Sequence, residues 1–489
     1  MVNDFMSAYN FNFQHSYKEL DGIFYSCVDP TPVADPKLVV INETLLASLN
    51  LDFSNLSDQQ QANLFSGNIL SEGSSPLAQA YAGHQFGHFA ILGDGRAHLL
   101  GEHVTPSGAT FDIQLKGSGP TPYSRNGDGR AALGPMLREY IISESMHALG
   151  VPTTRSLAVV STGEQVRRET PLPGAILTRV ATSHIRIGTF QFAAAQKDKT
   201  LLKALLNYTI DRHEPLLKRT DSPALSLLDS VIQLQSDLIT NWLRIGFIHG
   251  VMNTDNVTLA GETIDYGPCA FMDQFDPKKV FSSIDRMGRY SYANQPKIIQ
   301  WNIARLAEAL LPLIDENFDK SIEVANEKIN GFEKIFESKY VSMVRSKLGL
   351  FGEHKEDKEL YTDLTSWMHK HEKDFTNTFR DLSKERLLEK QDYQNNDFKD
   401  WHKRWKKRQE KNDMPKSSSI SLMERTNPWL VPRNHNVERA LQAAQEQDLD
   451  PFRKLLESIK DPYQENPKFG YYKSPPKPHE RVLQTFCGT

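Results

Sequence analysis

The sequence predicts an α+β fold of two lobes, and three observations support the prediction. Apolar and polar residues alternate in Thr110–Lys116, as is typical of strands. Apolar residues recur at helical spacing between Leu227 and Ile245, and this pattern stops at Gly246. The polar stretch that follows carries oxygen-bearing side chains, which are the usual equipment of a catalytic or metal site. We therefore expect a strand-rich lobe, a helix-rich lobe and a site supplied by both.

Length and composition are those of an ordinary globular protein larger than one average domain. The chain has 489 residues, of which 39% are hydrophobic and 24% are charged, and its net charge is −4. Nothing in this balance indicates nucleic acid or an anionic membrane as a partner. No apolar run has transmembrane length and the N-terminus lacks the pattern of a signal or transit peptide, so we expect a cytoplasmic protein. The cysteines Cys27, Cys269 and Cys487 have neither metal-ligand spacing nor the arrangement of a disulfide framework.

Four regions are expected along the chain. They are an N-terminal extension (1–75), an N-lobe-like nucleotide-binding region (76–195), a C-lobe-like catalytic region with the base and metal loop (196–320), and a helical C-terminal region with a tail (321–489). In the extension, a helix is expected around Asn42–Leu49.

A glycine-containing turn opens the second region. The apolar runs Phe89–Leu92 and Ala97–Gly101 are joined by Gly93-Asp94-Gly95-Arg96, and Asp-Gly between apolar runs predicts a β-hairpin. A plain structural hairpin is one interpretation. The other is a nucleotide-covering loop, in which Gly93 and Gly95 let backbone N–H groups approach phosphate while Arg96 adds positive charge.

The strand Thr110–Lys116 ends in a lysine that is a candidate phosphate ligand. Phe111, Ile113 and Leu115 alternate with polar residues, so a half-buried strand is expected. A phosphate-binding lysine at this point needs a carboxylate partner on the next helix, expected over 135–148. Glu139 and Glu144 are both candidates, and we choose Glu139.

The long glycine-rich connection before that helix is expected to be functional, because it exceeds a simple turn. Within it, Asp128 and Gly129 are candidates to face a ligand. Two arginines then follow in the strand-like stretch after residue 150. Arg179 and Arg186 are seven residues apart and would face opposite sides of one strand, so a bend or helix start near Thr182–Ser183 is expected between them. Together they are typical of an anion clamp.

The loop from His249 to Gly267 holds the most specific signal. Asp255 and Asn256 are adjacent, Asp265 begins an Asp-Tyr-Gly sequence, and a short hairpin is expected between them. Helix, loop, hairpin and Asp-aromatic-Gly is the order found in protein-kinase-like phosphotransferases, where an Asn and an Asp hold Mg²⁺ and another Asp accepts a proton. The position of the usual base in small-molecule kinases is Val251 here. Either Asp255 is the base or the reaction is not phosphoryl transfer.

The last region reads as helices with a proline-rich, extended tail. The basic run Lys403–Arg408 could mark nucleic-acid binding, but Phe398, Trp401 and Trp405 lie at helical spacing around it. A packed apolar face with a solvated basic back is therefore favoured.

Taken in order, several motifs resemble the selenoprotein O family over nearly the whole chain. They are GHQFGHFAILGDGRA, QLKGSGPTPYSRNGDGRA, TRVATSHIRIGTFQ, HGVMNTDN, DYGP, GRYSYANQP and NPWLVPRNH. The resemblance implies a protein-kinase-like two-lobed fold with an N-terminal extension and helical C-terminal additions. It also implies a protein adenylyltransferase, in which ATP binds in a flipped orientation and AMP passes to Ser, Thr or Tyr hydroxyls of proteins.

Residue roles follow from the same resemblance. Nucleotide ligands would be Gly93, Gly95, Arg96, Lys116, Asp128, Gly129, Arg179, Arg186 and Asp265. Asp255 would be the base, Asn256 and Asp265 would hold Mg²⁺, with Mn²⁺ as the alternative, and Glu139 would pair with Lys116. A γ-phosphoryl kinase, a UMP transferase using UTP and a nucleotide-binding scaffold are the alternative functions.

This chain departs from the family pattern in one respect, a regulatory disulfide that some relatives form. In those relatives the C-terminal Cys or selenocysteine pairs with a cysteine of the segment after Asp-Tyr-Gly. In this chain that segment has only Cys269, directly after Asp-Tyr-Gly-Pro. A bridge between Cys269 and Cys487 is left as an alternative and is not the expectation.

Overall fold

A large antiparallel sheet and many helices make up the computed structural model, which describes residues 11–85 and 87–486. Ten strands form the sheet, in the order β2-β4-β6-β7-β10-β9-β3, with β1 on β6, β5 on β4 and β8 on β10. Their bounds are β1 (Phe13–Gln14), β2 (Tyr25–Cys27), β3 (Lys37–Ile41), β4 (Leu77–Gln85), β5 (His88–Gly93), β6 (Ala97–Val104), β7 (Thr110–Lys116), β8 (Ala131–Ala132), β9 (Arg155–Arg167) and β10 (Pro171–Ala181). A separate pair joins β11 (Phe247–Ile248) to β12 (Ala270–Phe271).

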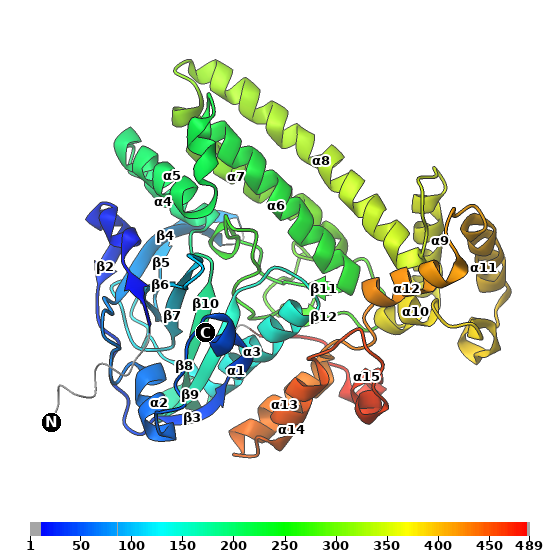
Figure 1. Cartoon of the computed structure of the whole chain (residues 1–489), viewed down its shortest axis with the longest axis horizontal. Helices are drawn as coiled ribbons and strands as arrows, with labels where there is room; N and C mark the ends of the chain where they lie inside the picture. The colour runs from blue at the N-terminus through cyan, green and yellow to red at the C-terminus, as the bar shows by residue number, and fades with distance from the viewer. Residues whose placement is uncertain (1–10, 86, 487–489) are drawn as a thin grey trace.

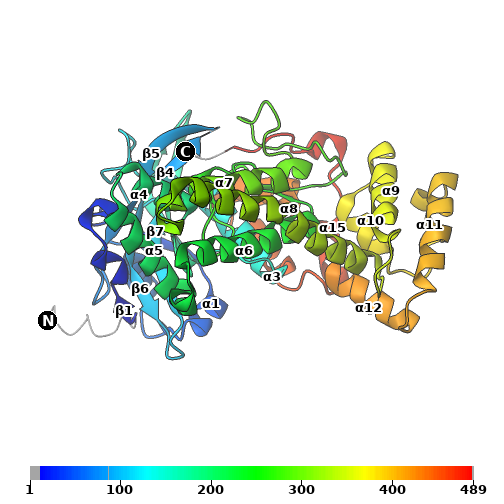
Figure 2. The same ribbon diagram turned by 90° about the horizontal axis from the view of Figure 1, so that it is seen from above.

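Helices cover the sheet and extend away from it. Their bounds are α1 (Glu43–Ser48), α2 (Asp58–Ser66), α3 (Leu133–Ala148), α4 (Ile187–Ala195), α5 (Lys199–His213), α6 (Pro223–Ile245), α7 (Gln295–Ile314), α8 (Phe318–Leu348), α9 (Asp357–Lys370), α10 (Phe375–Asp381), α11 (Asn396–Gln409), α12 (Lys416–Thr426), α13 (Asn434–Gln445), α14 (Asp450–Ser458) and α15 (Gly470–Lys473). Figures 1 and 2 show the sheet at one end of the molecule and α9–α12 at the other, with α6, α7 and α8 side by side between them. None of the helices within the described residues has the length and apolar character needed to cross a membrane.

The described part of the N-terminal segment is built into the sheet. β1 pairs with β6, β2 with β4 and β3 with β9, so strands from the first 75 residues occupy three places in it. α1 and α2 add a buried apolar cluster that includes Leu45, Leu64 and Phe65 together with sheet residues such as Ile113. This segment therefore completes the sheet that supports the site.

The prediction of a hairpin around Gly93–Arg96 is wrong, because the two flanking strands, β5 and β6, do not pair with each other. β5 pairs with β4, where Ala80 lies opposite Gly93, and no ladder among the described residues joins β5 to β6. β6 instead pairs along its length with β7. Asp94 and Gly95 also lack the positive φ of a type I′ turn. Strand pairing is decided by which edges are free, and both edges of β6 are taken, one by β7 and the other by β1 and β4.

Strand β7 has the predicted bounds, but it is buried on both faces. Its polar residues Asp112, Gln114 and Lys116 are all at most 7% exposed. Alternation therefore does not indicate a solvated face here. A buried polar face requires partners for every charge, and the partners of Gln114 and Lys116 belong to the site described below.

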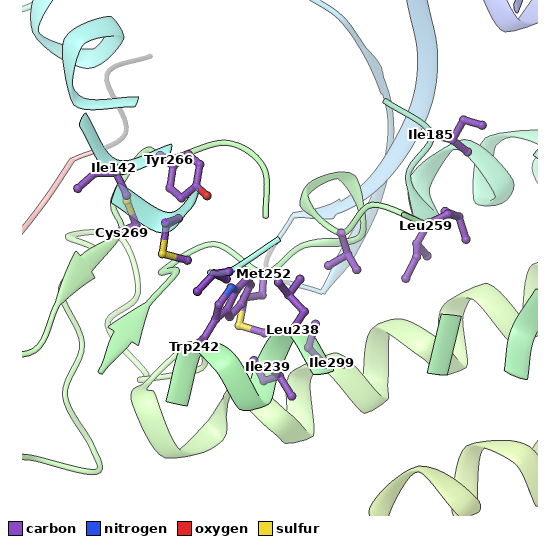
Figure 3. Packing of buried hydrophobic residues seen from close by; sticks show 14 of the residues in the cluster. Ile142, Ile185, Leu238, Ile239, Trp242, Met252, Leu259, Tyr266, Cys269 and Ile299 are labelled. Atoms are coloured by element: carbon purple, nitrogen blue, oxygen red, sulfur yellow. The ribbon is translucent and has the colours of Figure 1, made fainter. Parts of the chain in front are cut away.

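Helix α6 delivers the chain into the loop that carries Asp255. It ends at Gly246, whose φ of +74° is the left-handed conformation that favours glycine. Figure 3 shows Leu238 and Trp242 of α6 packed beside Met252 of the loop and Ile299 of α7. Buried apolar contacts on several sides thus fix the loop's backbone.

The C-terminal region confirms one prediction and corrects another. Phe398, Trp401 and Trp405 of α11 are buried, so the aromatic face is packed as expected. The tail is not uniformly extended, because it contains α15. Near its end, Thr485 donates its backbone N–H to Phe281 O at 2.7 Å. Cys487 lies outside the described residues.

Candidate functional site

A single cavity of about 520 Å³ contains every residue singled out from the sequence as a site residue. These are Gly93, Gly95, Arg96, Lys116, Asp128, Gly129, Glu139, Arg179, Arg186, Asp255, Asn256 and Asp265. They come from the sheet and its turns, from the loop between β7 and β8, from α3, from the start of α4 and from the loops that follow α6. Segments far apart in sequence are thus brought to one hollow, which is where a ligand-binding site is ordinarily found.

Lys116, at the end of β7, is held between two carboxylates. Its Nζ lies 2.7 Å from Glu139 Oε2 and 2.6 Å from Asp265 Oδ1. Of the two glutamates considered as partners, Glu144 instead contacts Arg155 at 2.6 Å. Helical geometry explains this difference, because residues five apart on α3 point in different directions.

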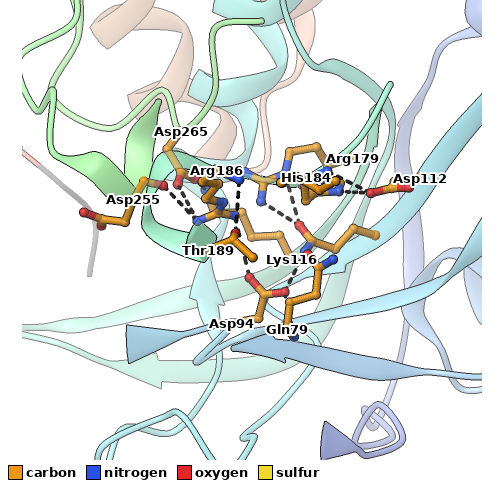
Figure 4. Close-up of polar contacts among 12 residues, drawn as sticks. Gln79, Asp94, Asp112, Lys116, Arg179, His184, Arg186, Thr189, Asp255 and Asp265 are labelled. Carbon is orange, nitrogen blue, oxygen red and sulfur yellow. Dashed lines mark hydrogen bonds and ion pairs between the residues drawn. The ribbon is translucent and has the colours of Figure 1, made fainter. Parts of the chain in front are cut away.

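The two arginines converge on the same carboxylate. β10 ends at Ala181 and α4 begins at Ile187, so the chain bends between them as expected. Arg179 Nη1 lies 2.8 Å from Asp265 Oδ1, and Arg186 Nη1 lies 4.0 Å from Asp265 Oδ2 (Figure 4). Each arginine is only 2% exposed. A straight strand would direct the two side chains to opposite sides. The bend instead directs both toward Asp265.

Asp265 is the centre of this charged cluster. Burial acts to raise its pKa, but Lys116, Arg179 and Arg186 overcome that effect and hold the pKa well below its usual range. The residue also has a positive φ of 62°, which is uncommon outside glycine, so its position is fixed by the surrounding structure. Glu139 and Asp94 also contact these cations, so three carboxylates balance the charge of Lys116, Arg179 and Arg186. The three cations nevertheless line the cavity together, and their N–H groups are suited to bind phosphate oxygens.

Asp255 occupies a different environment in the same cavity. Its backbone carbonyl accepts a hydrogen bond from Arg186 Nη1 at 3.1 Å, whereas its carboxylate is directed away from Asp265 (Figure 4). The Oδ1 atom is buried and has no hydrogen-bond partner within the described part of the chain. Burial raises the pKa of Asp255 to about 6, although Arg186 acts to lower it. A carboxylate with a pKa near neutrality is suited to accept a proton.

The hairpin expected between Asp255 and Asp265 is not formed. Thr258 bridges to Arg186, and Thr263 bridges to Thr153. Thr258 is therefore paired with the residue before α4, and Thr263 with the segment just before β9. These contacts with other segments hold the backbone between Asp255 and Asp265 in place beside the cavity.

Asn256 and Asp265 line the cavity and carry oxygen atoms of the type that a hard divalent cation prefers. Asn256 Nδ2 donates to Val251 O at 3.1 Å, which leaves the amide oxygen as the atom able to ligate a cation. Asp265 is ionised at neutral pH because of its low pKa. Oxygen ligands of this type suit Mg²⁺, which commonly takes one or two protein side chains plus phosphate oxygens and water.

The turn around Gly93 is covered by the loop that precedes α3. A Cβ at Gly93 would lie 2.7 Å from Tyr123 Cδ1, so glycine is required there by the close approach of an aromatic ring. Thr121 Oγ1 donates to the backbone oxygen of Asp94 at 2.7 Å and ties the two segments together. The glycine at this position thus has a packing reason that is independent of any phosphate.

Asp128 and Gly129 lie on the same covering loop. The Asp128 carboxylate is exposed and lies 2.9 Å from Arg168 Nη1. Gly129 has a φ of +66° and approaches the backbone of Gly119 too closely for a side chain. Asp128 is therefore at the cavity's rim, whereas the arginines are on its buried wall.

Three residues of the site were missed by sequence reasoning. Tyr81 places its ring 4.3 Å from the guanidinium carbon of Arg186. Gln114 accepts from Arg179, and Asp94 approaches Arg186. The sequence pattern indicates only a turn residue at Asp94. Gln114 could have been found, because it shares the polar side of β7 with Lys116, two residues later.

Comparison with known proteins matches this chain to the family described as "Protein adenylyltransferase SelO" over residues 7–460. A "Protein nucleotidyltransferase YdiU" of Nitrosococcus oceani is 58% identical over 479 residues, covering 98% of this chain and 97% of the relative. Relatives of the same description from Alcanivorax borkumensis and Pelagibacter ubique are 54% and 52% identical, covering 99% and 98% of this chain and 100% and 99% of their own lengths.

Proposed function

This chain belongs to the SelO family of protein adenylyltransferases and is a nucleotidyltransferase, and from this premise we propose that it transfers AMP from ATP to Ser, Thr or Tyr hydroxyls of other proteins. Pyrophosphate is the second product. The proposal includes a kinase-like arrangement of two lobes, in which region 76–195 binds the nucleotide and region 196–320 supplies the base and the metal ligands. ATP then lies reversed relative to its orientation in kinases.

The observation that most supports AMP transfer is the buried position of the cations Lys116, Arg179 and Arg186 around Asp265. If the two outer phosphates of ATP bind these cations, the departing group is pyrophosphate, and its growing charge is stabilised where the cations are already oriented. The valine at position 251, which cannot accept a proton, agrees with a reaction that does not use the usual kinase base.

In the proposed reaction, the target hydroxyl oxygen attacks the α-phosphorus. The new O–P bond forms as the bond from the α-phosphorus to the bridging oxygen breaks, and pyrophosphate departs with that electron pair. Asp255 takes the proton of the hydroxyl, a role that typically contributes about 10²- to 10⁴-fold in rate. Asn256 and Asp265 would hold Mg²⁺ or Mn²⁺, which would neutralise phosphate charge when bound.

A labelling experiment tests the proposal directly. The full chain is incubated with a protein substrate mixture and with ATP labelled at either the α- or the γ-phosphate. Protein-bound label from α-labelled ATP alone is expected, and Asp255→Asn should abolish it. Label from the γ position alone would show a kinase instead. α-Labelled UTP in a parallel reaction separates AMP transfer from the alternative of UMP transfer.

A further inference from the structure

Two buried polar side chains lie between the arginines of the cavity. Arg179 donates from Nε and Nη2 to Gln114 Oε1, at 3.2 and 2.6 Å. Gln114 Nε2 donates in turn to Asp94 Oδ2 at 3.1 Å. The other oxygen of that carboxylate, Asp94 Oδ1, is 3.7 Å from Arg186 Nη2. The series Arg179–Gln114–Asp94–Arg186 therefore connects both arginines through one amide and one carboxylate.

The polar atoms of Gln114 and Asp94 each make a different contact. Gln114 is 0% exposed and Asp94 is 3% exposed, so every polar atom needs a partner within the protein. Asp94 Oδ2 accepts both the backbone N–H of Gln79, at 3.2 Å, and the amide of Gln114. Of the residues in this series, only Arg186 lies near Asp94 Oδ1. One carboxylate oxygen thus holds the turn in place, and the other acts on an arginine.

Arg186 does not depend on Asp94 alone for its position. Its guanidinium lies over the Tyr81 ring at 4.3 Å and donates to Asp255 O at 3.1 Å. Arg179 has other partners too, because its Nη1 donates to Asp265 and Glu139. Its Nε and Nη2, however, both use Gln114 as their acceptor. Loss of Gln114 would therefore misplace Arg179, whereas loss of the charge on Asp94 would leave Arg186 in place with less of its charge offset.

We propose that Gln114 is a positioning residue for Arg179 and that Asp94 lowers the anion affinity of Arg186. Together they set how tightly the cavity binds pyrophosphate, so that the product is stabilised as it forms and is still released. The inference rests on the proposed function, because it takes pyrophosphate to be the ligand of the two arginines. It adds two residues to the site and assigns them opposite effects.

Two variants separate the effects. Gln114→Met has similar length and removes both the acceptor for Arg179 and the donor to Asp94. Asp94→Asn can keep both N–H bonds, because Gln79 and Gln114 share one oxygen, and it replaces the charged oxygen that faces Arg186 with an uncharged NH2 group. Opposite changes in anion affinity are therefore expected, which a purely structural role for either residue would not produce.

The measurement is the dissociation constant of inorganic pyrophosphate for the full chain, together with its inhibition constant in the AMP-transfer assay. We expect Gln114→Met to weaken binding about tenfold, which equals about 1.4 kcal/mol. We expect Asp94→Asn to tighten binding and inhibition several-fold. Changes of the same sign in both variants, or no change in either, would overturn the inference.

Asp112→Asn is the matched control. Asp112 is also on β7 and is 3% exposed. Its partners, Arg212 at 2.8 Å and His184 at 3.0 Å, lie outside the set of described residues that line the cavity. This variant should lower the Tm and leave the pyrophosphate constants unchanged. If Gln114→Met does not fold, the comparison of Asp94→Asn with Asp112→Asn decides the matter, since only the former should bind pyrophosphate more tightly.

Arg186→Lys and Arg179→Lys distinguish failure of this inference from failure of the proposed function. If neither lysine variant changes pyrophosphate binding, the arginines are not the pyrophosphate site and the proposed function loses its main support. If both weaken binding while the Gln114 and Asp94 variants match wild type, only the present inference is wrong.

Discussion

Gly83 of β4 and Asp255 face each other so closely that no side chain fits between them. A Cβ on Gly83 would overlap Asp255 Oδ1 and would lie 2.7 Å from both Asp255 Cγ and Leu92 Cδ1. The Asp255 carboxylate, which we propose as the base, can therefore occupy this position only because residue 83 has no side chain.

Gly83→Ala should therefore impair the reaction more than the fold. The added methyl group displaces the Asp255 carboxylate, and a displacement of about 1 Å can cost about 100-fold in rate. We expect kcat to fall at least tenfold, with little change in ATP binding. The control is Gly331→Ala in α8, where nothing lies within 4 Å of the added Cβ. It should keep full activity and stabilise the helix by about 1 kcal/mol. Equal kcat values for both variants would contradict the placement of Asp255.

The rate of AMP transfer should depend on the ionisation of Asp255. Because burial raises the pKa of Asp255 to about 6, the base is ionised above that pH and protonated below it. We expect kcat/KM to be constant above pH 7, to be half-maximal near pH 6 and to fall tenfold for each further unit of acid. The measurement is a pH–rate profile over the range in which the protein stays folded. A profile without this inflection would exclude Asp255 as the base.

Asp255→Asn should also make the protein more stable in alkaline conditions. The folded-state pKa of about 6 exceeds the ordinary value of 3.8, so the ionised form costs stability once the pH is above 6. The cost disappears as the pH falls below 3.8, where the carboxyl is protonated in both states. Asparagine carries no charge, so the variant should gain about 1–3 kcal/mol at pH 8, allowing for partial exposure, and nothing near pH 4. Thermal unfolding without nucleotide, at both pH values, provides the measurement.

Glu139 and Glu144 should have different effects when each is changed to Gln. Glu139→Gln removes a buried counter-charge from Lys116 and Arg179, so we expect a loss of about 3 kcal/mol in stability and a loss of ATP binding. Glu144→Gln removes the partner of Arg155, outside the cavity lining, and should lower the Tm without changing ATP binding. Comparable ATP affinities in the two variants would show that the Lys116 ion pair is not needed for nucleotide binding.

Features that depend on a few neighbouring residues were predictable from the sequence. The bounds of β7 follow from alternation, and α6 follows from its apolar spacing and Gly246. The bend before Arg186 also followed from two arginines that a straight strand would have separated. In each case the determining interactions lie within one element or one turn.

Features that depend on distant pairing were not predictable. An Asp-Gly turn indicates a reversal of the chain, but both edges of β6 are occupied by strands other than β5, namely β7 on one edge and β1 and β4 on the other. Thr258 and Thr263 likewise pair with residues outside their own loop, Arg186 and Thr153, and no pattern within the loop indicates these partners. Asp94 was overlooked because an aspartate in a turn is common on the surface. Its burial appears only when Gln79 and Gln114 are brought to it.

The position of β3 has a consequence for how the protein is made. Leu38 pairs with Val160, a residue that leaves the ribosome long after Leu38 itself. The backbone N–H and C=O groups along this edge of β3 must therefore stay unpaired with their final partner until β9 has been synthesised. Newly made chains should be most in need of chaperones during that interval.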